Sequence, residues 1–212
     1  MAAIVVDHVS KILGPQLVLN DVSIECGEKC IVGITGRNGS GKSVLFKCIC
    51  GLILQDIGTV TIKGQSNTDY IRSGNGLGAI IEEPAFLDRY SGRKNLELLY
   101  SVRNRKDREH INMILEKVGL DAEAKKRVGK YSMGMKQRLA IAQAIMEDQE
   151  VLLLDEPMNG LDNAGVEDMR KLFLELREEG KTILLASHNK EDISCLCDCV
   201  YEMDAGTIKN VL

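Results

Sequence analysis

One glycine-rich segment constrains the fold of this 212-residue chain more than any other part of its sequence. The segment Gly36-Arg37-Asn38-Gly39-Ser40-Gly41-Lys42-Ser43 matches the pattern G-x-x-x-x-G-K-[ST]. An apolar run at residues 31–35 precedes it and predicts a buried strand, and residues 44–50 predict a helix packed on the same sheet. Strand, glycine loop and helix in this order indicate a phosphate-binding loop (P-loop) in an α/β fold.

The residue types of this loop indicate what it binds. Glycines permit a tight turn whose successive backbone N–H groups point inward at the start of a helix, which suits an anion. Lys42 adds a positive charge for the β- and γ-phosphates of a nucleotide, and the Ser43 hydroxyl is a suitable Mg²⁺ ligand. We expect every residue of the loop to contribute to this nucleotide site: Gly36, Arg37, Asn38, Gly39, Ser40, Gly41, Lys42 and Ser43.

Composition excludes several other classes of protein. A net charge of −4 gives no reason to expect nucleic acid as a partner. No apolar run approaches the ~20 residues that span a bilayer, and residues 1–7 lack the features of a signal peptide. The seven cysteines are interpreted as reduced, small apolar side chains rather than as metal ligands. We therefore expect a cytoplasmic protein, which would work at a membrane only by docking to another chain.

Hydrophobic patterning predicts two kinds of strand. Alternating apolar residues bounded by glycine turns predict half-exposed strands at 3–9, 16–25 and 58–64. Shorter continuous apolar runs predict buried strands at 79–81, 151–154 and 182–187. A glycine-rich stretch at 74–78 is expected to be flexible, and a last hairpin is expected around the turn at 204–206.

Between residues 84 and 148 the pattern becomes helical. Asp107 is suited to cap a helix that Gly119 ends, and another helix is expected to begin near Gly134. We predict a single domain over residues 1–212, with a helical subdomain at about 84–148 and a core made of 1–83 and 149–212. The predicted fold class is α/β, with a central, mostly parallel sheet, an antiparallel β-subdomain and a helical insertion; a helix at about 164–179 belongs to the core.

Two carboxylates end the apolar run 151–154. Ligands bind at the carboxyl ends of parallel strands, so Asp155 and Glu156 should lie beside the P-loop. Asp155 is placed for Mg²⁺, and Glu156 for polarising the water that attacks the γ-phosphate. His188, after the strand 182–187, should reach the same edge and could bond the γ-phosphate or orient Glu156.

Two further motifs flank the acidic pair. Residues 131–139, Tyr131-Ser132-Met133-Gly134-Met135-Lys136-Gln137-Arg138-Leu139, precede it, and Asn159-Gly160-Leu161-Asp162 follows it. With the P-loop and His188, they resemble in order and spacing the signature motif, D-loop and switch histidine of ABC-type P-loop NTPases. Over essentially its whole length, the chain is similar to the ATP-binding subunit of an ABC transporter, which hydrolyses ATP to ADP and phosphate.

The resemblance implies a head-to-tail dimer of two such domains, identical or different. Each ATP would lie between the P-loop of one copy and Ser132, Gly134 and Asp162 of the other. Ser132 and the first amides of the next helix offer donors and a positive helix end to the γ-phosphate. The dimer would dock to an integral membrane permease on the inner face of the cell membrane. Candidate contacts, for which burial in the insertion is the alternative, are Phe86, Leu87, Tyr90 and Leu98.

Three positions depart from the family pattern. Leu13 occupies the place of an aromatic residue that stacks on adenine, so apolar contact would replace stacking. Glu82 replaces a glutamine and, as a carboxylate, is expected to reach Mg²⁺ or the attacking water. Met133 and Met135 replace a glycine and a glutamine of the signature motif, and Met133 would be strained if its position required positive φ.

The stretch Glu82-Glu83-Pro84-Ala85-Phe86, together with residues 131–138, is similar to exporters of the bacitracin-resistance and lantibiotic-immunity type. This resemblance implies export of a peptide antibiotic or a similar amphiphile. Two alternatives stay open. The first is an ABC-type ATPase without a membrane subunit, for example in iron–sulfur assembly, and the second is a P-loop kinase. Measuring phosphate release without an acceptor would separate the ATPase from a kinase, and copurification of a multispanning membrane protein would separate a transporter from a soluble ATPase.

Overall fold

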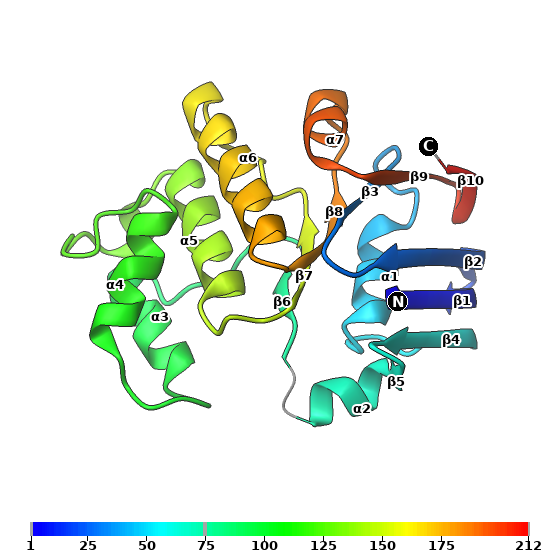
Figure 1. Ribbon diagram of the computed structural model, residues 1–212, viewed down its shortest axis with the longest axis horizontal. Coiled ribbons are helices and arrows are strands. Elements are labelled where there is room, and N and C mark those ends of the chain that lie inside the picture. Colours follow the sequence, from blue (N-terminus) through cyan, green and yellow to red (C-terminus); the bar gives the residue numbers. More distant parts are fainter. Residues whose placement is uncertain (1, 74–75, 212) are drawn as a thin grey trace.

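The computed structural model describes residues 2–73 and 76–211, and two sheets dominate it (Figure 1). The smaller sheet is antiparallel, with strand order β2-β1-β4-β5. Gly14, at φ +58°, closes the turn between its two long strands, as its position in the sequence predicts. This sheet confirms the antiparallel β-subdomain. Its strands are β1 (Ala2–Leu13), β2 (Gln16–Gly27), β4 (Ile57–Ile62) and β5 (Gln65–Ser66).

The larger sheet is mostly parallel, in the order β10-β9-β3-β8-β7-β6. β3 lies between β8 and β9 and runs parallel to both, and only the pair β9–β10 is antiparallel in the described part of this sheet. The α/β fold with a mostly parallel central sheet is therefore confirmed. Its strands are β3 (Ile31–Thr35), β6 (Gly78–Ile80), β7 (Val151–Asp155), β8 (Thr182–Ala186), β9 (Cys199–Asp204) and β10 (Thr207–Val211).

The larger sheet is covered on both faces, because its central strands carry apolar residues on both sides. Along β7, Val151 and Leu153 belong to a core that lies toward the antiparallel sheet, whereas Leu152 and Leu154 belong to a core beneath the helices. Helix α1 (Lys42–Ile49) contacts β7 of one sheet and β2 and β4 of the other. Burying Phe46 completely between the two sheets removes the apolar face of α1 from water, which stabilises the start of the helix that follows the P-loop.

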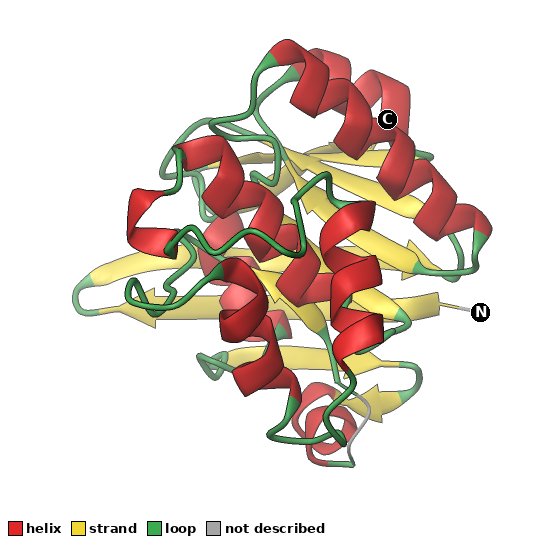
Figure 2. Ribbon diagram, turned by 90° about the vertical axis from the view of Figure 1, so that its left-hand side faces the viewer, coloured by secondary structure: helices red, strands yellow, loops and turns green. Residues whose placement is uncertain are grey.

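The predicted helical region contains α3 (Gly92–Tyr100), α4 (Arg108–Lys117) and α5 (Met133–Ile145), which lie in front of the strands in Figure 2. Asp107 accepts a hydrogen bond from the His110 amide at 2.9 Å, so it is the expected N-cap of α4. Gly119, at φ +75°, follows the end of that helix. The exact limits 84 and 148 of this subdomain stay a prediction.

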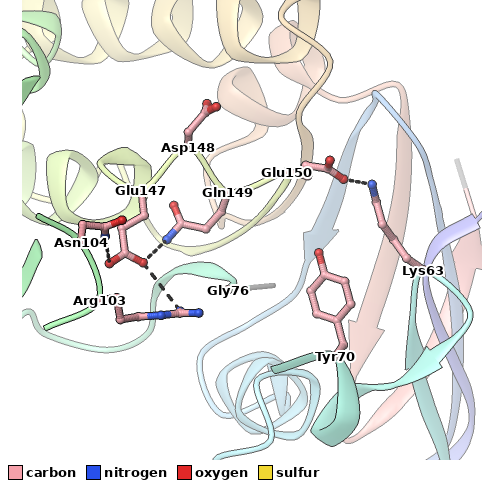
Figure 3. Close-up of a pocket in the computed structure, with 9 residues that line it drawn as sticks. All are labelled: Lys63, Tyr70, Gly76, Arg103, Asn104, Glu147, Asp148, Gln149 and Glu150. Carbon is pink, nitrogen blue, oxygen red and sulfur yellow. Dashed lines mark hydrogen bonds and ion pairs between the residues drawn. The ribbon is translucent and has the colours of Figure 1, made fainter. Parts of the chain in front are cut away.

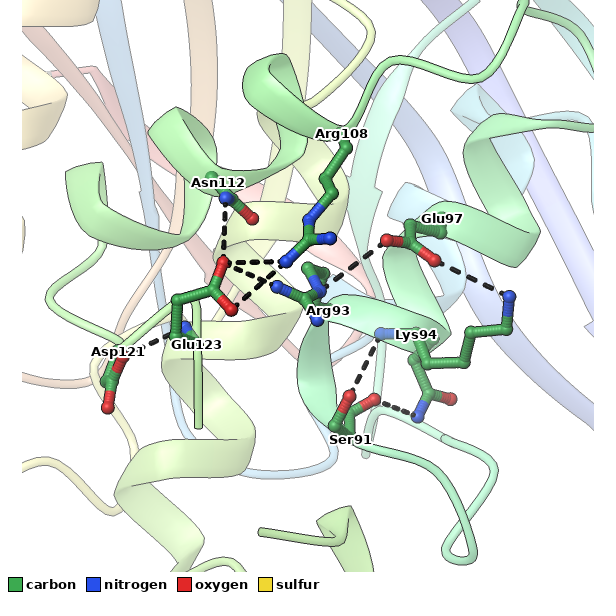
Figure 4. A network of polar contacts seen from close by, with 9 residues as sticks. Ser91, Arg93, Lys94, Glu97, Arg108, Asn112, Asp121 and Glu123 are labelled. Carbon is green, nitrogen blue, oxygen red and sulfur yellow. Dashed lines mark hydrogen bonds and ion pairs between the residues drawn. The ribbon is translucent and has the colours of Figure 1, made fainter. Parts of the chain in front are cut away.

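A polar network connects α3, α4 and the loop that leads toward α5 (Figure 4). The Glu123 carboxylate accepts bonds from Arg93 of α3 at 2.7 Å and from Arg108 of α4 at 3.0 Å. Asn112 of α4 donates to the same carboxylate at 3.3 Å. These two guanidinium groups hold the pKa of Glu123 below its usual range. The network fixes the loop before the Ser132 segment to two helices.

Three more helices complete the core. The predicted helix near 164–179 is α6 (Asn163–Glu178), and Gly180 follows its end at φ +95°. Two short helices, α2 (Asn67–Arg72) and α7 (Lys190–Leu196), had no prediction from the sequence. Residues 74 and 75 of the stretch expected to be flexible lie outside the described residues. No helix in the described ranges is both long and apolar enough to cross a bilayer.

Candidate nucleotide-binding site

The P-loop lies between β3 and α1, and close backbone packing requires its glycines. A Cβ on Gly36 would lie 2.2 Å from the Met203 carbonyl oxygen of β9, so a larger residue would displace that strand. Gly41 has φ +110°, a conformation that side chains other than glycine rarely adopt. The Gly206 amide donates to the Ser40 carbonyl at 2.9 Å. The turn between β9 and β10 therefore supports the loop from behind.

The two residues after the glycines are held inside the site. The Lys42 ammonium donates to the carbonyls of Gly36 at 2.8 Å and Arg37 at 3.2 Å, and the side chain is buried. The Ser43 hydroxyl donates to the Asp155 carboxylate at 2.6 Å, which joins α1 to the end of β7. The structure thus brings the P-loop and the acidic pair together, as the sequence predicts.

The surroundings of the Asp155 carboxyl group suit the binding of a cation. Burial raises the pKa of its carboxyl, the Ser43 hydrogen bond opposes this shift, and the negative charge of Glu156 raises the pKa further. Burial and the neighbouring negative charge thus disfavour the ionised carboxylate, and a bound divalent cation would stabilise it. Hydroxyl and carboxylate oxygens are the donors that Mg²⁺ takes, so Ser43 and Asp155 fit the predicted ion.

Hydrogen bonds hold Glu156 at its backbone amide and at one carboxylate oxygen. Its backbone is left-handed, at φ +50°, and its amide donates to the Ala186 carbonyl of β8 at 2.9 Å. Oε2 lies 2.8 Å from Nδ1 of His188, which donates when the proton is on that nitrogen. Oε1 is buried without a hydrogen-bond partner among the residues that the structure describes. His188 therefore orients one carboxylate oxygen, and the buried second oxygen has no partner among the described residues.

Sequence reasoning did not assign a role to Gln137, which the structure places against Glu156. Its buried amide nitrogen donates to the carbonyls of Pro157 at 3.0 Å and Glu156 at 3.4 Å. Helix α5, which begins with the Ser132 motif, thereby holds the strained backbone of the acidic pair. The sequence did carry a signal for this role, because Gln137 is a polar residue on a face of α5 whose other buried residues are apolar.

Gln137→Leu should lower kcat for ATP hydrolysis about tenfold and leave KM for ATP unchanged, since it removes donors behind Glu156 and nothing at the P-loop. Steady-state phosphate release at varied ATP measures both constants. Gln143→Leu, on the same helix, is the matched control and should change neither. An equal loss in both variants would contradict a specific role of Gln137.

Three neighbouring clefts contain most of the predicted site residues, whereas Gly36, Arg37 and His188 line a further cleft of about 930 Å³. A cleft of about 320 Å³ contains P-loop residues, Asp155 and Glu156. A second, of about 530 Å³, shares the acidic pair and adds Glu82, Gln137 and Met133. Ser132, Gly134 and Asp162 line a third, of about 640 Å³, which shares Met133 with the second. Within one copy, the structure does not bring Ser132, Gly134 or Asp162 to the P-loop.

Two departures from the family pattern have structural outcomes. Leu13 ends β1 with 39 % of its surface exposed and is not among the described residues that line the P-loop cleft, whereas Val18 of β2 lines it. The contact of Leu13 with a base therefore stays a prediction. Met133 begins α5 and is not one of the described residues at positive φ, so it is not strained. Its side chain packs on Gly160 instead.

Another cavity, of about 470 Å³, lies between α2 and the loop after α3 (Figure 3). Its charged lining residues are already in ion pairs: Lys63 pairs with Glu150, Arg103 with Glu147, and Asp148 with Lys181 outside the lining. Amide groups of Asn104 and Gln149 donate to Glu147 at 3.2 Å. This pairing leaves the P-loop clefts as the candidate site.

Comparisons with known proteins agree with this geometry. A family model described as "ABC transporter" matches residues 19–159. The chain is 39% identical over 206 residues to the uncharacterized ABC transporter ATP-binding protein YdbJ of Bacillus subtilis, covering 96% of this chain and 67% of that one. It is 36% identical over 202 residues to the bacitracin transport ATP-binding protein BcrA of Enterococcus faecalis, covering 94% and 66%.

Two further similarities extend the comparison. The lantibiotic transport ATP-binding protein SrtF of Streptococcus pyogenes is 31% identical over 195 residues, covering 92% of this chain and 84% of that one. A solved ATP-binding subunit of an ABC transporter superposes with a TM-score of 0.89 at 25% identity, covering 99% and 89%. A bacterial cassette solved as a dimer has a TM-score of 0.90 at 24% identity, which shows the shared fold. The chain therefore belongs to the ABC transporter family, as an ATP-binding and ATP-hydrolysing subunit of the ABC type.

Proposed function

We propose that this chain hydrolyses ATP in a head-to-tail dimer and powers transport through a separate membrane permease. The observation that carries the proposal is the division of the site: Lys42, Asp155 and Glu156 line adjoining clefts, while Ser132 and Asp162 line another. A nucleotide on one P-loop would leave its γ-phosphate open to bulk water. A second copy would cover that phosphate with the Ser132 end of α5.

The residues around the acidic pair support a hydrolytic mechanism. Lys42 and the P-loop amides would hold the β- and γ-phosphates, and Ser43 and Asp155, joined by Glu82 as predicted, would hold Mg²⁺, which neutralises phosphate charge when bound. The Glu156 carboxylate accepts a proton from the attacking water while the water oxygen bonds to the γ-phosphorus. The bond to the bridging oxygen breaks, so ADP and phosphate leave, and the hydrogen bond of His188 to Oε2 keeps the carboxylate in place.

The helical subdomain offers a surface for the permease. Leu87, Tyr90 and Leu98 are exposed in the segment after Glu82, whereas Phe86 packs partly against the core. Exposed apolar side chains grouped on one segment are typical of an interface. We propose that this segment receives the permease and holds the chain on the cytoplasmic face of the membrane. Because BcrA and SrtF are named for bacitracin and lantibiotic transport, we propose an exported peptide antibiotic or a similar amphiphile as cargo.

Leu87→Asp should abolish recovery of a multispanning membrane protein with the tagged chain, because a charge replaces an exposed apolar contact. Affinity purification from detergent-solubilised native membranes, followed by mass spectrometry, measures the loss. Met113→Asp, at an exposed position on α4, is the control and should not reduce recovery. If the purified chain hydrolyses ATP but recovers no membrane protein, an ATPase without a role in transport would be favoured. If phosphate is released only when an acceptor is present, a kinase would be favoured.

A further inference from the structure

Glu82 lies beside the catalytic acidic pair because of the register of the sheet. Ile80 of β6 pairs with Leu154 of β7 in parallel, so the residues two positions later, Glu82 and Glu156, follow at the same edge. Both have left-handed backbones, at φ +61° and +50°. Glu82, Asp155 and Glu156 also line one cleft. Three carboxylates therefore lie together at this edge, next to the P-loop cleft that Asp155 and Glu156 also line.

Helix α1 meets this edge twice on one face. Ser43 bonds Asp155, and Lys47, four residues and thus about one turn later, forms an ion pair with Glu82. The Lys47 side chain is 24% exposed and that of Glu82 is 62% exposed, so the pair lies at the rim of the cleft. Among the described residues, no three acidic, histidine or cysteine side chains converge to hold one metal ion. The ion pair thus holds the Glu82 carboxylate beside Lys47 of α1, at the rim of the cleft that Asp155 also lines.

We propose that Lys47 is a positioning residue that neutralises Glu82, so that this carboxylate does not repel the phosphates of ATP. The inference rests on the proposed nucleotide site. A neutral side chain at position 82 would need no such partner, whereas a carboxylate there adds a negative charge next to two others. Like charges in a partly desolvated cleft disfavour a bound anion. Lys47 acts through Glu82 and does not itself touch the nucleotide.

This role predicts different effects for the two single substitutions. Lys47→Met leaves the carboxylate unpaired and should weaken ATP binding about three- to tenfold, a range limited by the exposure of Glu82 to solvent. Glu82→Gln leaves Lys47 as a free cation and should retain or strengthen binding. Combining both substitutions should restore the affinity of the wild-type chain. A purely structural role of Lys47 gives no such reversal.

Equilibrium binding of ATP in EDTA, followed by isothermal titration calorimetry, measures the effect without a metal and without turnover. Lys117→Met is the matched control, because Lys117, at the end of α4, pairs at 2.9 Å with Glu179, the C-cap of α6, and should not affect affinity. Thermal unfolding of each variant checks that it folds. Wild-type chain that fails to bind ATP would overturn the proposed function itself.

Two results would overturn only the role of Lys47. The first is equal affinity of Lys47→Met and the wild-type chain. The second is a double variant as weak as Lys47→Met, which would mean that Lys47 contacts the phosphates directly. Raising the salt concentration provides an additional check, because a through-space charge effect should shrink as salt screens it.

Discussion

Glu156→Gln is expected to keep ATP binding, to reduce phosphate release by at least about 100-fold and to accumulate a dimer in ATP. The amide has the shape of the carboxylate but cannot accept the proton of the attacking water. The amide oxygen can still accept a hydrogen bond from His188, so the site stays assembled. Because hydrolysis would reopen the pair of copies, blocking it should leave them closed around two nucleotides.

Size-exclusion chromatography with light scattering, in Mg²⁺ with ATP or with ADP, measures this dimer. The dimer should form in ATP and not in ADP. Adding Lys42→Ala to the same chain should prevent it, because the second copy would then find no ordered γ-phosphate. A chain that stays monomeric in saturating ATP, while still binding it, would sink the shared-site mechanism.

The strands and the long helices could be predicted because local signals determine them. Asp107 caps α4, and Gly119 and Gly180 follow α4 and α6 in left-handed conformations, as their types indicate. The short helices α2 and α7 gave no comparable periodic signal. They depend on hydrogen bonds to other elements instead: Asn67 of α2 donates to the Cys48 carbonyl at 2.7 Å, and the buried Asp192 of α7 accepts from Arg170 of α6.

The site residues also fall into two groups, those that sequence motifs predict and those that only tertiary contacts reveal. Ser43, Asp155, Glu156 and His188 lie in motifs whose spacing fixes them at one sheet edge, and the structure brings them together. No such spacing rule applies to the supporting residues Val18 of β2, Gln137 of α5 and Lys47 of α1. Their roles arise from contacts between elements far apart in the chain, which a single sequence does not specify.

Lys42→Ala should weaken ATP binding about 100-fold, because it removes the positive charge that faces the phosphates from inside the P-loop. The lysine is buried on the carbonyls of Gly36 and Arg37, so its removal also leaves two acceptors without their donor. Calorimetric titration with ATP and Mg²⁺ measures the loss, and a thermal melt separates it from unfolding. Lys171→Ala, exposed on α6, should bind like the wild-type chain. Unchanged affinity in a folded Lys42→Ala chain would refute the phosphate role of the loop, and with it the basis for a site shared between two copies.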